Sequence, residues 1–405
     1  MLDDFGQRIR DIILSEMDLS RDLSDEEICD LIGSVVSREA RDRPMTIKDR
    51  AELERTIFNS LRKLDVLQEL VDDRDVTEIM VNGPNDIFYE KAGRIQRFKG
   101  HFSSEEKLED VIQQIVGRHN RVVNQASPIV DTRLSDGSRV NIVLNPISIG
   151  GSAVSIRKFP EHPMSMERLV EIEALSPEVA RLLQILTQAK YNIFISGGTG
   201  SGKTTFLNAL SQYIPDDERI ITIEDSAELQ LLGAKNIVRL ETRNANTDGV
   251  TPITIRDLIR TALRMRPDRI IVGECRGAEA LDMLQALNTG HDGSLSTGHA
   301  NSPHDIISRI ETMVLQGQDF PLNAIRQQIA SGIDIIVQLG RLRDKSRRVL
   351  EISEVDGFMD GEIVLHTLYR FEETAVLDSG RIQGFLKKAG TLCHTDKLMA
   401  AGLSV

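Results

Sequence analysis

The chain contains no tryptophan, only three cysteines, and no run that approaches the ~20 apolar residues of a transmembrane helix. Cys29, Cys275 and Cys393 are too far apart for a CxxC pair, which leaves neither a thiolate zinc site nor a disulfide framework to propose. The first four residues, Met1-Leu2-Asp3-Asp4, are acidic where a signal peptide is basic. We therefore expect a cytoplasmic protein whose membrane contacts go through partner proteins.

Positive charge and aromatic side chains are also scarce. The 49 lysines and arginines face 62 aspartates and glutamates, the formal net charge is −13, and aromatic residues make up 4% of the chain. Such a surface repels phosphate backbones and offers few platforms on which single-stranded bases stack, which argues against direct nucleic-acid binding. The 405 residues, 40% of them hydrophobic, are enough for two or three folded domains at ~100–200 residues each.

The first part of the chain, residues 1–66, has a helical pattern only. Ser24 and Glu27 form a capping box ahead of apolar residues at helical spacing. A further helix carries Leu53, Ile57 and Leu61, so we predict a small helical bundle.

Residues 70–158 have the pattern of an α+β domain. Short strands separated by turn residues begin at Val76 and predict a β-meander. A helix follows with a capping box at Ser103 and Glu106, and strands return at 140–144 and 153–156. Residues 159–175, which include Pro160 and Pro163, are the predicted linker.

Helices and apolar strands alternate through the rest of the chain, residues 176–405. A helix begins at Ser176-Pro177, and apolar strands occur at 192–195, 220–223 and 269–272. Continuous apolar strands of this kind are typical of a parallel sheet buried on both faces, so the predicted fold class is α/β. The C-terminal part is expected to be a β/helical extension.

A complete phosphate-loop motif, G-x-x-x-x-G-K-[ST], follows the strand that ends near residue 195. Its glycines allow backbone N–H groups to surround phosphates, and the following helix adds positive partial charge. Lys203 is predicted to reach the β- and γ-phosphates, and Thr204 to bind Mg²⁺. The predicted nucleotide-binding residues are Gly197, Gly198, Thr199, Gly200, Ser201, Gly202, Lys203, Thr204 and Thr205.

Two acidic segments stand after apolar strands, where carboxylates face the ligand crevice of an open α/β sheet. We predict that Glu224 and Asp225 hold Mg²⁺ together with Thr204. Glu274 and Glu228 are the predicted catalytic carboxylates, which would polarise the attacking water. Solvated loop acids are the alternative for either segment alone.

A polar segment from Gly290 to Asn301 contains His299, which we predict to be a hydrogen-bond partner of the γ-phosphate. The alternative is that His299 binds zinc. It is disfavoured because no acid or thiolate stands at a supporting spacing such as H-E-x-x-H.

These four blocks, in this order and at these separations, resemble the secretion ATPase superfamily that drives type II secretion, type IV secretion and type IV pili. The segment from Ile223 to Leu229 matches the family's Asp box, 273–277 its Walker B motif, and 290–299 its His box. The stretch 263–271, with 278–280 and 297–302, looks most like the CpaF branch, the motor of Tad pili. The similarity extends over roughly residues 70–370, and the N-terminal helices also fit CpaF-like proteins.

The sequence departs from the family pattern in two ways. Cys275 stands where an aliphatic residue is usual; it should pack equivalently, but it raises the question of oxidation at the site. The tetracysteine zinc module of type II secretion motors is absent, which argues against that branch.

The resemblance implies a RecA-like ATPase domain preceded by an α+β domain and a helical bundle. It also implies a homohexamer that uses ATP and Mg²⁺ to drive an inner-membrane platform protein from the cytoplasmic side. In the family, the N-terminal domain supplies arginines to the nucleotide, and here Arg133, Arg139 and Arg157 match that region. Structural salt bridges are the alternative role for each of them.

Other functions remain open from the sequence alone. A type IV secretion motor for protein or DNA shares every motif above, and a nucleic-acid translocase could use a similar core. A GTP-dependent switch is disfavoured because the chain has no Asn-Lys-x-Asp motif. The basic stretch 341–348 predicts an exposed hairpin, either a solvated turn or a contact for a protein or an anionic lipid.

Overall fold

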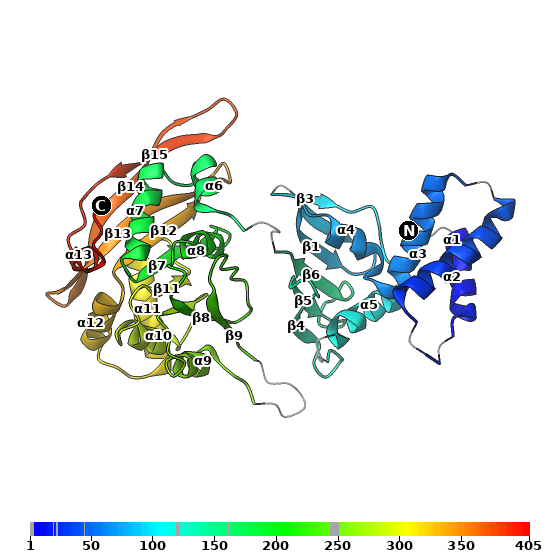
Figure 1. Cartoon of the computed structure of the whole chain (residues 1–405), viewed down its shortest axis with the longest axis horizontal. Coiled ribbons are helices and arrows are strands. Elements are labelled where there is room, and N and C mark those ends of the chain that lie inside the picture. Colours follow the sequence, from blue (N-terminus) through cyan, green and yellow to red (C-terminus); the bar gives the residue numbers. More distant parts are fainter. Residues whose placement is uncertain are drawn as a thin grey trace. The chain divides into compact units, whose positions relative to one another are not determined.

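The computed structural model describes residues 4–18, 20–21, 23–43, 45–91, 93–118, 122–159, 163–243 and 251–405. The chain forms two compact units, Met1–Glu161 and His162–Val405, labelled by element in Figure 1. We call them unit 1 and unit 2. The finer division at residues 66, 70, 158 and 176 stays a prediction. In the described part of the chain, no helix is both long and apolar enough to cross a membrane.

Unit 1 begins with helices that share one apolar core. They are α1 (Asp4–Glu16), α2 (Asp25–Glu39) and α3 (Ile47–Arg62). The short helix η1 (Ala40–Asp42) lies between α2 and α3, and η2 (Asp65–Leu67) and α4 (Gln68–Asp72) follow α3. The predicted capping box is confirmed: the Ser24 side chain accepts from the Glu27 N–H, and the Glu27 carboxylate accepts from the Ser24 N–H. Ile13, Ile32 and Ile57 are among the buried side chains that join the three long helices.

The rest of unit 1 is an antiparallel sheet with one helix on its apolar face. The strands are β1 (Val76–Asn82), β2 (Ile87–Lys91), β3 (Arg94–Arg97), β4 (Ile129–Arg133), β5 (Arg139–Val143) and β6 (Ala153–Arg157), in the order β3-β2-β1-β6-β5-β4. Helix α5 (Glu105–Gly117) packs Leu108 and Ile112 into the same core as Ile79 and Ile156. The predicted meander is confirmed by the pairing of β1, β2 and β3.

The predicted capping box at Ser103 and Glu106 is wrong by one residue. Ser104 is the N-cap, and its side chain accepts from the Lys107 N–H at 3.2 Å. The Glu105 carboxylate accepts the Ser152 N–H at 2.8 Å, which ties the start of α5 to the loop before β6. Only Ser103 has a glutamate three residues later, but both serines can cap a helix, and the contact of Glu105 with Ser152 accompanies the start of α5 after the second serine.

Unit 2 contains a mixed sheet whose central strands are parallel. These strands are β7 (Ile193–Gly197), β8 (Arg219–Glu224), β9 (Asn236–Glu241), β10 (Arg269–Val272), β11 (Leu295–Gly298) and β12 (Ile335–Arg341). The antiparallel strands β13 (Arg347–Met359), β14 (Glu362–Val376) and β15 (Ile382–Lys388) extend one side, and the full order is β15-β14-β13-β12-β7-β11-β10-β8-β9.

Helices cover both faces of this sheet, as the continuous apolar strands predict. The helices are α6 (Met166–Glu171), α7 (Pro177–Gln188), α8 (Lys203–Ser211), α9 (Ile255–Ala262), α10 (Ala280–Leu287), α11 (Pro303–Gly317), α12 (Leu322–Gly332) and α13 (Asp396–Ala401). Ile193 and Ile195 belong to the core under α6, α7, α8 and α13, whereas Phe194 belongs to the core under α9 to α12. Helix α6 lies inside the predicted linker 159–175, and its Met166 and Leu169 are buried in unit 2.

Arg269, the first residue of β10, has a fully buried side chain. Its guanidinium pairs with both carboxylate oxygens of Glu218, and one terminal nitrogen donates to the carbonyls of Thr187 (2.8 Å) and Gly293 (3.1 Å). A Cβ on Gly293 would lie 2.6 Å from that nitrogen, so only glycine fits there. A buried charge is tolerated when it is paired and hydrogen-bonded in this way.

We predict that Glu218→Ala destabilises the protein by about 3–5 kcal/mol, because it leaves the Arg269 charge buried without its anion. Urea denaturation followed by circular dichroism measures the change. The control is Glu171→Ala, which removes an exposed pair with Arg168 and should leave the midpoint unchanged. Equal midpoints for the two variants would contradict the role assigned to Arg269.

Candidate active site

The predicted site residues of unit 2 come together at one edge of its sheet. Parallel strands end on the same side, and the register pairs Val272 with Ile223 and Gly298 with Ser196. The phosphate loop follows β7, Glu224 is the last residue of β8, and Glu274 and His299 come just after β10 and β11. The carboxyl edge of four strands therefore carries the candidate chemistry.

The phosphate loop has a backbone that only glycine adopts easily. Gly200 and Gly202 have φ angles of 71° and 94°, in the left-handed region. A Cβ on Gly197 would lie 2.5 Å from the Ser201 hydroxyl oxygen and 2.7 Å from the Leu339 carbonyl oxygen. Helix α8 starts at Lys203 directly after this turn, so its first N–H groups line the loop.

Lys203 places a buried ammonium inside the loop. Its Nζ donates to the carbonyls of Gly197 (3.1 Å) and Gly198 (3.2 Å) and lies 3.2 Å from Nδ1 of His299. Burial lowers the pKa of Lys203, while the Glu274 charge acts in the opposite direction. A bound anion could therefore take the place of these two carbonyl groups as the partner of the Lys203 ammonium.

His299 connects Lys203 to Glu274. Burial, together with the Lys203 charge, lowers the pKa of His299 below the usual value of about 6.5, so the imidazole is neutral at pH 7. Its Nε2 lies 2.8 Å from Oε1 of Glu274, in close contact but not aligned as a hydrogen bond. Since Nδ1 accepts from Lys203 and two lone pairs would repel, we assign the proton to Nε2. We call this arrangement the Lys203–His299–Glu274 network.

Arg276 restrains the other oxygen of Glu274. Its guanidinium donates to Oε2 at 2.7 Å and approaches the Asp225 carboxylate at 3.6 Å. Burial would raise the pKa of Glu274, but the hydrogen bond from Arg276 and the nearby positive charges lower it overall, so the carboxylate is ionised at neutral pH. Arg276 is not among the site residues predicted from the sequence, although its place two residues after Glu274 is a usable signal.

The remaining predicted acids have different surroundings. Glu224 is buried, and its Oε2 accepts the N–H groups of Glu228 (2.6 Å) and Leu229 (2.9 Å), so it holds the loop after β8 in place. Asp225 is exposed, and Glu228 is half-buried. The catalytic and metal-binding roles of these residues stay predictions.

The described residues contain no group of three or more histidine, cysteine, aspartate or glutamate side chains arranged around a metal. Mg²⁺ does not need such a cage, because it usually binds one or two carboxylates, substrate phosphates and water. The hydroxyl of Thr204 and the carboxylate of Asp225 are oxygen donors of the required kind. They fit this pattern better than Glu224, which already accepts two backbone N–H groups.

Cys275, next to Glu274, behaves as a core residue. It is buried, its sulfur lies 3.9 Å from the Met313 sulfur, and burial raises the pKa of its thiol. The thiolate is the form that reacts, so this environment disfavours oxidation. The expectation that Cys275 packs like an aliphatic residue is consistent with these contacts.

In unit 1, the predicted arginines form a row across three strands. Arg133 pairs in register with Arg139, and Arg139 with Arg157. Directly opposed residues share one face of a sheet, and here it is the face away from α5. Arg157 also donates to Glu78 at 2.8 Å. The contact of these three arginines with a nucleotide stays a prediction.

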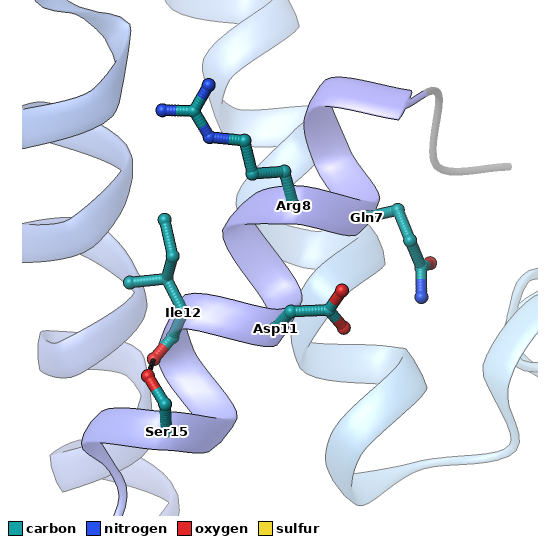
Figure 2. Close-up of a pocket in the computed structure, with 5 residues that line it drawn as sticks. All are labelled: Gln7, Arg8, Asp11, Ile12 and Ser15. Atoms are coloured by element: carbon teal, nitrogen blue, oxygen red, sulfur yellow. Dashed lines mark hydrogen bonds between the residues drawn. The ribbon is translucent and has the colours of Figure 1, made fainter.

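A surface hollow of about 500 Å³ lies beside α1. Its lining residues, Gln7, Arg8, Asp11, Ile12 and Ser15, are drawn in Figure 2. Arg8 pairs with Glu39 of α2 at 3.0 Å, and the Ser15 hydroxyl donates to the Ile12 carbonyl. These polar groups serve the helical bundle, and the chemistry-bearing cluster lies in unit 2.

Sequence comparison identifies relatives over most of the chain. Residues 60–383 match the family model for type II/IV secretion system proteins. The conjugal transfer protein TrbB of Rhizobium radiobacter is 31% identical over 332 residues, which cover 81% of this chain and 98% of TrbB. The type IV secretion system protein PtlH of Bordetella pertussis is 33% identical over 320 residues, which cover 73% of this chain and 94% of PtlH.

Solved structures share the fold. The pilus retraction motor PilT, solved with ADP, aligns with a TM-score of 0.54 and 22% identity over 82% of this chain and 84% of its own. The ATPase DotB of Legionella pneumophila aligns with a TM-score of 0.50 and 22% identity over 72% and 80%. The predicted RecA-like α/β fold, with an α+β region and helices before it, is confirmed. The chain belongs to the type II/IV secretion system protein family.

Proposed function

We propose that this chain is an ATP hydrolase that drives a secretion or pilus machine. The Lys203–His299–Glu274 network carries the proposal. It joins a buried ammonium inside a phosphate loop to an ionised carboxylate through a neutral imidazole. This is the arrangement needed to hold a polyphosphate and to activate water beside it.

Each residue of the network has a separate task in the proposed reaction. Lys203 and the loop N–H groups bind the β- and γ-phosphates and compensate their charge. Glu274 accepts a proton from the attacking water or orients it, and Arg276 keeps the carboxylate ionised and directed. The Nε2–H group of His299 can donate a hydrogen bond to a γ-phosphate oxygen. Mg²⁺, when bound, would add positive charge next to the phosphates, with Thr204 and Asp225 as its protein ligands.

The family resemblance suggests how hydrolysis is coupled to work. We infer a homohexamer on the cytoplasmic side of the inner membrane, in which unit 1 closes on the nucleotide and moves a platform protein. The arginine row, Arg133, Arg139 and Arg157, supports this inference, because guanidinium groups bind phosphate oxygens bidentately.

Tad pilus assembly is the specific role that we propose. The CpaF-like stretches 263–271 and 297–302 and the lack of a tetracysteine module support it. A type IV secretion motor is the second candidate, because the relatives TrbB and PtlH are named for conjugal transfer and type IV secretion. Crosslinking the full chain in its native membranes and identifying the bound platform protein separates the two roles.

Lys203→Ala should reduce phosphate release by more than ~10²-fold, because the loop then offers only amide dipoles to the γ-phosphate. Release of inorganic phosphate from ATP measures it. Lys235→Ala is the matched control, since Lys235 is exposed and pairs with Asp216 outside the site. Wild-type turnover by the Lys203 variant would refute the phosphate-loop assignment.

Glu274→Gln should retain ATP binding and lose about 10²-fold or more in turnover, because the phosphate loop is intact but the water has no base. Nucleotide binding by fluorescence and phosphate release are measured on the same sample. Asp216→Asn, outside the site, should change neither quantity. A folded Gln variant that no longer binds ATP would assign Glu274 to binding instead.

Arg133→Ala should lower kcat by ~10³ and leave ADP binding nearly unchanged, if the arginine stabilises charge only in the transition state. Lysine at this position should rescue poorly, because it lacks the bidentate fork. We propose that the arginines act on the site of their own chain. Mixed assemblies of Arg133→Ala and Lys203→Ala chains should then stay inactive, and recovered activity would place Arg133 in a neighbour's site.

A further inference from the structure

The basic stretch 341–348 lies beside the phosphate loop. Strand β12 runs parallel to β7 and pairs Leu339 with Gly197, the first residue of the loop. The chain then turns, and β13 returns with Arg347 opposite Arg341. The β12–β13 hairpin therefore emerges at the same sheet edge as the site, on the side of β7 away from β11.

Contacts within its turn and with β14 and β15 hold the β12–β13 hairpin in place. Asp344 accepts the N–H of Ser346 (2.9 Å) and the N–H of Ile382 (2.8 Å). Arg343 forms a bidentate pair with Glu373, and the buried Arg348 donates to the Ile382 carbonyl at 3.1 Å. These contacts fix the position of the hairpin. The predicted exposed hairpin is confirmed, and the structure adds the pairs formed by Arg343, Asp344 and Arg348.

Arg347 is the hairpin residue that contacts the phosphate loop. Its Nε donates to the Gly200 carbonyl at 2.8 Å, and its Cδ lies 3.4 Å from the position of a Cβ on Gly202. Its side chain is otherwise exposed, and within the described part of the chain that carbonyl is its one hydrogen-bond acceptor.

This contact orients a peptide group of the loop. A trans peptide is planar, so its C=O and N–H point in opposite directions. With the Gly200 carbonyl turned outward to Arg347, the Ser201 N–H points into the loop, where it donates to the Gly198 carbonyl at 3.3 Å. Inward N–H groups are the ones that bind phosphates.

We propose that Arg347 is a positioning residue of the nucleotide site, which keeps the phosphate loop in its anion-binding form from outside. The proposal rests on ATP being the ligand of this loop. It assigns one cation of the basic hairpin to the nucleotide site rather than to a protein or lipid surface.

The donor atom suggests a discriminating set of variants. In glutamine, Nε2 occupies the same place along the side chain as Nε of arginine, so Arg347→Gln keeps the donor and removes the charge. Arg347→Lys keeps the charge but has a carbon at that place. Arg347→Ala removes both. Arg341→Ala, which removes the exposed cation opposite Arg347, is the control.

The dissociation constant for ADP, the KM for ATP and kcat are measured on the full chain, with the melting temperature as a check on folding. Arg347→Ala should weaken ADP binding and raise KM by about five- to tenfold, with kcat within about twofold of wild type. Arg347→Gln and Arg341→Ala should stay close to wild type, and Arg347→Lys should resemble Arg347→Ala.

Two results would overturn the proposal. Wild-type ADP affinity in Arg347→Ala would show that the loop needs no outer support. Rescue by lysine but not by glutamine would show that the charge acts on the nucleotide directly. A wild-type protein that neither binds ADP nor hydrolyses ATP would instead refute the proposed function, so the two failures are distinguishable.

Discussion

The buried guanidinium of Arg269 is the contact on which the geometry of unit 2 depends. Its partners are Thr187, at the end of α7 ahead of β7, Glu218, directly before β8, and Gly293, two residues before β11, while Arg269 itself opens β10. One ion pair with two carbonyl contacts therefore joins the chain ahead of four parallel strands. The far ends of these strands carry the phosphate loop, Glu224, Glu274 and His299.

The four parallel strands that start near Arg269 bring the candidate site residues together at their other ends. A strand rises about 3.3 Å per residue, so β10, β11, β7 and β8, each of four to six residues, deliver their last residues to one edge. Loops that leave this edge are free to carry polar groups, because the apolar strands and the helices on both faces already supply stability. The Lys203 ammonium is held there by carbonyls and a neutral imidazole, an environment that a phosphate can share.

The protein is acidic overall, but several of its arginines lie close to the candidate site or in one row of the unit 1 sheet. The net charge of −13 disfavours polyanions as general ligands, yet arginines concentrate at particular places. Arg276 stands against Glu274, Arg347 against the phosphate loop, and Arg133, Arg139 and Arg157 in one row of the unit 1 sheet. Local charge, rather than the total, is what recognises a small anion, since opposite charges a few ångströms apart interact far more strongly than distant ones.

The sequence alone determined the α/β class, the strand positions at 193, 220 and 269, and the place of the phosphate-loop motif, because apolar periodicity and the glycine-lysine motif are local properties. It also marked Glu274 and His299, since polar residues directly after buried strands must face the open edge of a sheet. Only the tertiary structure decided that His299 lies between Lys203 and Glu274, that Glu224 holds a loop, and that Arg276 and Arg347 border the site. The N-cap of α5 and the burial of Arg269 were likewise decided by contacts between segments far apart in the chain. The physical reason is the same in each case: a charged side chain takes the partner that folding brings near, and strand register and loop packing set that partner.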